Sequence, residues 1–201
     1  MSTALDFYFD FSSPYGYFGA TKIEALAAAA GREVEWHPLL LGAIFKNIGT
    51  ASLVSVPLKG PYSLHDMQRS ARFHGIPFRM PDTFPVSTQI AARAMLWIKQ
   101  HLGKAVATQF ALAVYHAYFY DNQDIGSLPL ILDIAAANGA DRPQLEAALA
   151  QDEIKNALKA SIEAALERGV FGAPFVIVDG EAFWGLDRFE QLAAFLKNGS
   201  I

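Results

Sequence analysis

Strand-forming patterns occur only near the two ends of this 201-residue chain, and the long stretch between them carries the apolar spacing of helices. Residues 5–11 alternate Leu and Phe with Asp, Tyr and Asp, which predicts a strand with its apolar side chains inward and the others outward. The alanine-rich residues 14–30 predict a helix that ends at Gly31, and "EVEWHPL" at 33–39 predicts a second strand. This order makes a βαβ unit, so the two strands are expected to be parallel.

The middle of the chain has a different pattern. Residues 45–61 contain several glycines and prolines without a clear period, which predicts mainly loop. From there to residue 168 the spacing predicts a bundle of helices, at 63–74, 88–102, 104–120, 128–137, 142–150 and 153–168.

The strand pattern returns in "APFVIVDGEAFWG", residues 173–185, which predicts a hairpin around an Asp179-Gly180 turn. Residues 188–197 then predict a last helix. Without the helical block the order is βαβ-ββα, which is that of a thioredoxin-like domain. We therefore predict an α/β fold in which residues 1–44 and 169–201 form a thioredoxin-like domain and residues 45–168 form a large inserted all-helical domain.

Composition narrows the chemistry. The chain has no cysteine, which excludes disulfides, thiolate nucleophiles and zinc–thiolate sites, and its five histidines lack metal-ligand spacing, so no metal is expected. A net charge of -4 without a basic cluster argues against nucleic acid and anionic membranes as partners. No apolar run is long enough to span a bilayer, and the first residues lack a signal-peptide pattern, which favours the cytoplasm.

Ser13 is the first candidate functional residue. It precedes Pro14, which suits the first position of a helix, so Ser13 is expected to be the N-cap. Its hydroxyl is either only a cap or a hydrogen-bond donor to a bound anion. It is a poor nucleophile without a neighbouring base, and a thiolate at this position would have to come from a ligand.

Two further stretches carry candidates near the C-terminus. Pro174 enters an apolar strand and is either a trans proline at a sheet edge or, as in a thioredoxin-like fold, a cis proline that faces Ser13 at the start of the first helix. The cis form would leave the backbone of Ala173 free to pair with an extended peptide. Asp187 precedes the last helix, and Glu190 lies three residues later, so Asp187 is expected to cap that helix; its other oxygen is then free for a ligand ammonium group.

Five motifs together carry a family resemblance, and they are "DFSSPYGYFG", "VPLKGPY", "HGIPF", "FGAPFVI" and "FWGLDRF". In this order and spacing the chain resembles the 2-hydroxychromene-2-carboxylate isomerases, which are related to kappa-class glutathione transferases and to bacterial disulfide-bond oxidoreductases. The resemblance implies glutathione as cofactor, an aromatic carboxylate as substrate, and a homodimer. Ser13 and Gly16 lie where the oxidoreductases keep their two cysteines, so disulfide exchange is not available.

The resemblance also implies roles for single residues. Ser13 would hold the glutathione sulfur, Ala173 its backbone and Asp187 its γ-glutamyl end, while Lys46 would bind the substrate carboxylate and Phe84 the substrate ring. The other residues implied to bind glutathione are Pro14, Tyr15, Thr50, Lys59, Pro174, Trp184, Gly185 and Leu186.

The expected reaction is the glutathione-dependent isomerisation of 2-hydroxychromene-2-carboxylate, or a similar aromatic pyruvate adduct, to trans-o-hydroxybenzylidenepyruvate, a step of naphthalene-type catabolism. Two alternatives remain open at this point. One is a kappa-like glutathione transferase, which keeps the sulfur on the product. The other is a non-catalytic thioredoxin-fold protein that uses the groove to bind a peptide or a partner.

Overall fold

A four-stranded mixed sheet built from both ends of the chain organises the fold. In the computed structural model, which describes residues 4–201, the strands are β1 (Leu5–Phe9), β2 (Val34–Pro38), β3 (Phe175–Val178) and β4 (Glu181–Trp184), in the order β2-β1-β3-β4. β1 pairs with β2 in parallel and with β3 antiparallel, so that Phe7 lies opposite Trp36 on one side and Val176 on the other. The predicted βαβ unit and the hairpin β3–β4 are both present.

The helix predicted at 14–30 is two helices, α1 (Pro14–Ala20) and α2 (Ile23–Ala29). The interruption lies at Thr21 and Lys22. The Thr21 hydroxyl donates to the carbonyl of Phe18 (2.8 Å), and the Lys22 N–H donates to Gly19 (3.0 Å), three residues back instead of four. A side-chain hydrogen bond of this kind competes with the backbone hydrogen bonds of the helix. The spacing of apolar residues does not reveal such a bond, so the break between α1 and α2 was not predicted.

The helical block begins earlier than predicted. Residues 45–61 are not mainly loop, because α3 (Leu41–Ile48) runs into this stretch and α4 already begins at Lys59. The predicted domain boundary between residues 44 and 45 therefore falls inside α3. The remaining elements are η1 (Leu53–Ser55), α4 (Lys59–His74), α5 (Gln89–Leu102), α6 (Lys104–Phe119), α7 (Leu128–Ala137), α8 (Arg142–Ala150), α9 (Asp152–Glu167), η2 (Leu186–Arg188) and α10 (Phe189–Asn198).

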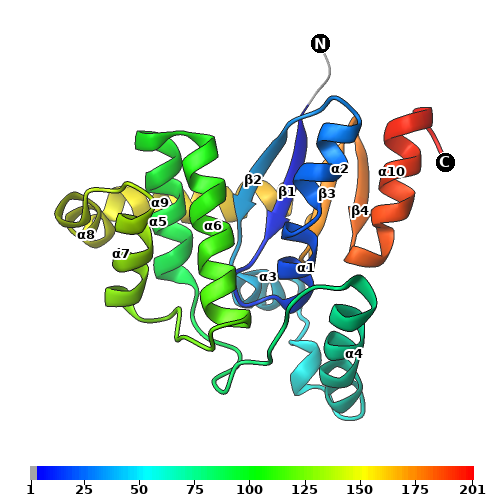
Figure 1. Cartoon of the computed structure of the whole chain (residues 1–201), viewed down its shortest axis with the longest axis horizontal. Helices are drawn as coiled ribbons and strands as arrows, with labels where there is room; N and C mark the ends of the chain where they lie inside the picture. The colour runs from blue at the N-terminus through cyan, green and yellow to red at the C-terminus, as the bar shows by residue number, and fades with distance from the viewer. Residues whose placement is uncertain (1–3) are drawn as a thin grey trace.

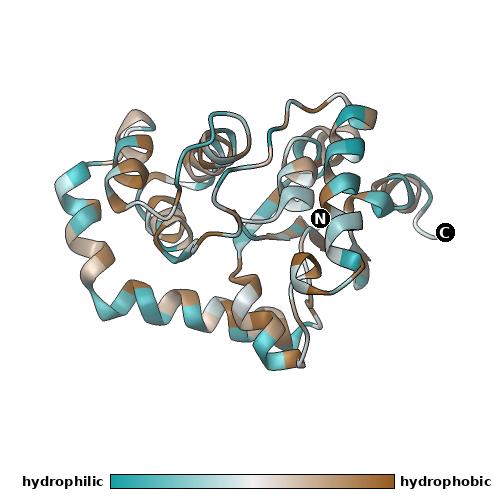
Figure 2. Ribbon diagram, turned by 90° about the horizontal axis from the view of Figure 1, so that it is seen from below, coloured by the Kyte–Doolittle hydropathy of each residue, from teal (hydrophilic) through white to brown (hydrophobic). Residues whose placement is uncertain are grey.

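Figure 1 shows α5–α8 grouped on one side of the sheet, α10 beside β4 on the other side, and α4 below. The hydrophilic residues of the helices lie mostly on the outside of the molecule (Figure 2). Among residues 4–201, no helix has both the length and the apolar content that a membrane crossing requires.

Both faces of the sheet are covered, which corrects the inward–outward assignment for β1. Phe7 and Phe9 belong to the larger apolar core, as expected. Tyr8, predicted to point outward, is buried in a second core with Leu158 and Ile162 of α9. Asp10 was also expected outward and is only 5% exposed. An alternating pattern identifies one buried face, but it does not show that a distant helix covers the other.

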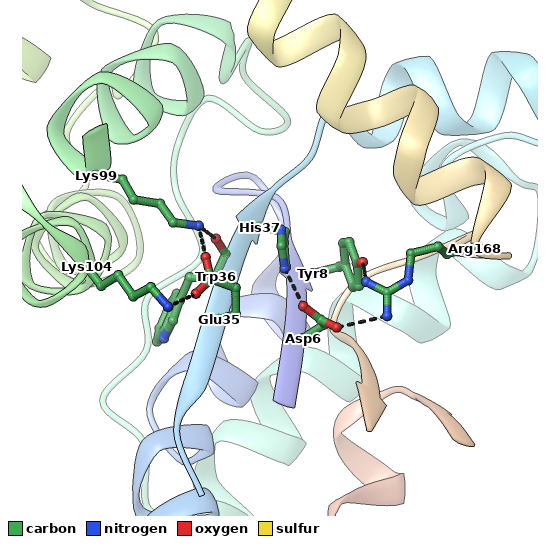
Figure 3. Close-up of polar contacts among 8 residues, drawn as sticks. All are labelled: Asp6, Tyr8, Glu35, Trp36, His37, Lys99, Lys104 and Arg168. Carbon is green, nitrogen blue, oxygen red and sulfur yellow. Dashed lines mark hydrogen bonds and ion pairs between the residues drawn. The ribbon is translucent and has the colours of Figure 1, made fainter. Parts of the chain in front are cut away.

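Two groups of ion pairs connect the sheet to the helical block (Figure 3). Glu35 of β2 pairs with Lys99 of α5 and with Lys104 of α6. Asp6 of β1 pairs with Arg168, which follows α9 (2.8 Å), and makes a hydrogen bond with His37 of β2 (2.7 Å). The helical block is thus held to β1 and β2 by charge as well as by apolar packing.

Candidate functional site

A cavity of about 740 Å³ opens where the two ends of the chain meet the helical block. The segments 12–15, 50–54, 171–173 and 184–188 line it, together with residues of α3 and α4 and the loop before α5. It therefore collects the β1–α1 turn, the stretch after α3, and the turns on both sides of the hairpin β3–β4.

Ser13 lines this cavity and is 6% exposed. Its hydroxyl oxygen accepts a hydrogen bond from the Gly16 N–H (3.0 Å), which confirms the predicted N-cap of α1. The same hydroxyl donates to the carbonyl of Ala173 (3.3 Å), a residue 160 positions later. A hydroxyl has one hydrogen to give, so a ligand anion in the cavity would compete with Ala173 for it.

The Ala173–Pro174 peptide bond is cis, as predicted. Ala173 faces Ser13 and lines the cavity. Its carbonyl was expected to be free, but it already accepts a hydrogen bond from the Ser13 hydroxyl. Pro174 is buried and is not part of the cavity wall. A second cis bond, Phe84–Pro85, lies in the loop before α5 and was not predicted.

Gly16 has no room for a side chain. A Cβ there would lie 2.8 Å from the Tyr115 hydroxyl oxygen and 3.0 Å from the Ser13 Cβ, and both of those residues are buried. The family resemblance matches Gly16 to the second cysteine of the disulfide-bond oxidoreductases. In this protein, buried side chains occupy the space that a side chain at that position would need.

The predicted cap at Asp187 is wrong. Asp187 lies within the short helix η2, Arg188 occupies the N-cap position of α10, and no side chain caps that helix. The Asp187 carboxylate is exposed and pairs with Arg188 (3.0 Å). It lies over Gly185, whose φ is +97° and where a Cβ would lie 2.4 Å from the Asp187 oxygen. Both charged groups line the cavity.

The two predicted lysines do not line the cavity. Lys46 on α3 and Lys59 at the start of α4 are exposed and lie outside its wall. Thr50 and Phe84, also predicted, do line it. Among residues 4–201, Arg188 is the one Lys or Arg side chain in this wall. Sequence reasoning did not single out Arg188, because its only signal was its place beside Asp187.

Tyr15 belongs to a polar pair that was also missed. Its hydroxyl donates to the Asp66 carboxylate of α4 (2.6 Å), and Asp66 pairs in turn with Arg69. Burial and the Asp66 contact raise the pKa of Tyr15 well above its ordinary value. Burial favours the protonated form of Asp66, but hydrogen bonds from Tyr15 and Arg69 outweigh it and hold the Asp66 pKa below its usual range. The pair connects α1 to α4 across the cavity wall.

The rest of the wall is largely apolar and includes several aromatic side chains. Phe45, Phe84, Phe171 and Trp184 line the cavity, and the rings of Phe171 and Trp184 meet edge to face with their centroids 4.8 Å apart. Flat aromatic ligands pack well against such surfaces. The site therefore combines the Ser13 hydroxyl, the Asp187–Arg188 ion pair and largely apolar walls.

Comparisons with known proteins show which family the chain belongs to. A family model described as a DSBA-like thioredoxin domain matches residues 4–197. The chain is 29% identical over 199 residues to the 2-hydroxychromene-2-carboxylate isomerase of Sphingobium xenophagum, covering 98% of this chain and 99% of that one. It is 26% identical to glutathione S-transferase kappa 2 of Caenorhabditis elegans, covering 94% and 90%. A solved 2-hydroxychromene-2-carboxylate isomerase structure, 25% identical, matches with a TM-score of 0.86 over 97% of this chain and 95% of that chain. The resemblance read from the five motifs is confirmed.

Proposed function

The chain belongs to the DSBA-like thioredoxin domain family, and on that premise we propose that it is a glutathione-dependent isomerase of the 2-hydroxychromene-2-carboxylate type. Its relatives include such isomerases and kappa-class glutathione transferases. The observation that carries the proposal is the buried Ser13 hydroxyl, which lies in a cavity opposite Ala173, in a chain that has no thiol of its own.

The residues around Ser13 fit the chemical groups of glutathione. The Ser13 hydroxyl can turn from the Ala173 carbonyl to a sulfur anion, and that carbonyl then accepts an N–H of the peptide instead. The γ-glutamyl end carries an ammonium and a carboxylate, and the neighbouring Asp187 and Arg188 offer one charge of each sign for them.

When bound, glutathione would supply the thiolate that adds to an unsaturated substrate and leaves again, so that a double bond can change its geometry. Ser13 stabilises that thiolate by donating its hydrogen bond. The aromatic side chains of Phe45 and Phe84 hold the substrate ring flat against the wall, where they also exclude water.

The binding step is tested by titrating the protein with glutathione in a calorimeter, with S-methylglutathione as a matched ligand that keeps the peptide and blocks the thiolate. Glutathione should bind more tightly, and more so as pH rises toward the thiol pKa. Equal affinity for both ligands would contradict a thiolate site at Ser13, and no binding of either would favour a non-catalytic binding protein.

The chemical step is tested with 2-hydroxychromene-2-carboxylate and glutathione, followed by mass analysis of the product. Isomerase activity leaves the product mass equal to that of the substrate and consumes no glutathione. A product heavier by one glutathione would identify a kappa-like transferase instead.

The proposal includes a cytoplasmic homodimer. A monomeric mass in size-exclusion chromatography with light scattering would contradict the homodimer.

A further inference from the structure

Asp10 is a buried carboxylate that the proposed reaction does not use. It is 5% exposed and has no ion-pair partner within residues 4–201. Burial raises its pKa above the ordinary value, and the hydrogen bonds that it accepts work in the opposite direction. A carboxylate removed from water without a cation costs free energy that must be offset by hydrogen bonds, so the bonds that Asp10 makes are informative.

Each bond to the Asp10 carboxylate comes from a different element. One oxygen accepts from the Ser12 N–H (2.9 Å) and from the Thr88 hydroxyl (2.9 Å), and the other accepts from the Leu41 N–H (2.6 Å). The backbone carbonyl of Asp10 also accepts the Tyr115 hydroxyl of α6 (2.9 Å) and the Ser13 N–H (2.9 Å).

The donors belong to segments that surround the cavity. Ser12 is part of the β1–α1 turn that carries Ser13. Leu41 is the first residue of α3, which contributes Phe45 to the wall and has no side-chain cap of its own. Thr88 ends the loop that carries Phe84 and immediately precedes α5. One carboxylate thus holds three parts of the cavity wall at fixed distances from one another.

We propose that Asp10 is a positioning residue of the candidate site, which sets the separation of the Ser13 turn, α3 and the Phe84 loop so that a ligand can contact all three. The proposal rests on the proposed function only where glutathione is the probe. It predicts that removing hydrogen bonds of the Asp10 carboxylate lowers ligand affinity more than it lowers the stability of the fold.

The test substitutes Asp10→Asn, which keeps an acceptor for Ser12 and Thr88 but turns an N–H₂ group toward the Leu41 N–H. The matched control is Asp6→Asn on β1, four residues before Asp10, whose carboxylate contacts His37 and Arg168, away from the cavity. In a second pair of variants, Thr88→Val removes the hydroxyl donor and Thr88→Ser keeps it. This pair tests the proposal if Asp10→Asn does not fold.

Glutathione affinity and urea unfolding are measured for each variant. Asp10→Asn should raise the glutathione Kd about tenfold, as expected for one lost bond to a charged acceptor. Thr88→Val should raise it less, and Thr88→Ser should restore it. Asp6→Asn should lower the urea midpoint and leave the Kd within about twofold of wild type. Equal Kd values for Asp10→Asn and Asp6→Asn, or no rescue by Thr88→Ser, would overturn the proposal.

Hydrogen–deuterium exchange provides a readout that does not need glutathione. In Asp10→Asn, peptides covering α3 should exchange faster than in wild type, while those of α5 and α6 stay unchanged. Unchanged exchange in α3 would overturn the positioning role. If wild type does not bind glutathione, the proposed function fails, and this exchange measurement still decides the role of Asp10.

Discussion

Replacing Ser13 by alanine separates a structural cap from a functional hydroxyl. The substitution removes the acceptor of the Gly16 N–H and the donor to the Ala173 carbonyl. Loss of a helix N-cap costs about 1 kcal/mol of stability. Loss of the longer bond to Ala173 adds about 0.5–1 kcal/mol, so the expected decrease in the free energy of unfolding is about 1.5–2 kcal/mol.

The effect on bound glutathione is a different quantity. A hydrogen bond from a neutral hydroxyl to a charged acceptor contributes about 1.5–3 kcal/mol, and 1.36 kcal/mol corresponds to one pKa unit. We therefore expect the thiol pKa of glutathione bound to wild type to lie about 1–2 units below its value in Ser13→Ala. Turnover at neutral pH should fall in the variant because less of the cofactor is ionised.

The assay follows the ultraviolet absorbance of the thiolate against pH, with both proteins saturated by glutathione. Asp141→Ala is the matched control, because Asp141 caps α8 through the Gln144 N–H (2.9 Å) and is exposed, away from the cavity. It should lose about 1 kcal/mol of stability and leave the thiol pKa unchanged. If Ser13→Ala lost stability but titrated like wild type, the hydroxyl would be a cap and nothing more.

Three other substitutions follow from the geometry. Asp187→Ala should change the free energy of unfolding by less than about 0.5 kcal/mol, because Asp187 caps no helix. The Kd should rise for glutathione but not for cysteinylglycine, which lacks the γ-glutamyl group. Equal losses of affinity for both ligands in the calorimeter would contradict this prediction. Gly172→Ala places a Cβ 2.4 Å from the Trp184 ring nitrogen, so the indole should move outward, with a red-shifted fluorescence and weaker glutathione binding; an unchanged spectrum would count against it. Burial lowers the pKa of His37 in the folded protein, despite the opposing Asp6 contact. The unfolded chain therefore binds a proton at His37 at a higher pH than the folded protein does. Stability should fall as pH drops through about 6.5. Urea unfolding of His37→Gln above and below that pH should show a smaller fall than in wild type; the same fall in both proteins would refute it.

The elements that sequence predicted well are those whose causes are local. The hairpin follows from Asp179-Gly180, the N-cap follows from Ser13-Pro14, and both are present. The misses have distant causes. α3 has no capping residue of its own, because its first N–H is bound by Asp10, 31 positions earlier. A pattern-based reading of residues 41–48 has no access to that bond.

The same limit applied to the candidate site. The predicted thioredoxin-like order, with a proline before its third strand, led to the prediction that Ala173 faces Ser13, and the hydrogen bond between them agrees with it. The two lysines were assigned by motif alone, and neither lines the cavity. Arg188 and the Tyr15–Asp66 pair became visible only with the fold, since they depend on the approach of η2 and α4 to the cavity.

The position of β1 has a consequence for how this protein is made. β1 is a central strand, and its partner β3 lies some 170 residues further along the chain. Synthesis proceeds from the N-terminus and domains fold as they emerge, so α4–α9 are complete while β1 still has an open edge and Ser13 has no Ala173 to contact. The cavity can therefore form only after residues 171–188 have been made. A chain interrupted before Phe175 would leave β1 with an unpaired edge, which is the kind of surface that aggregates and that chaperones bind.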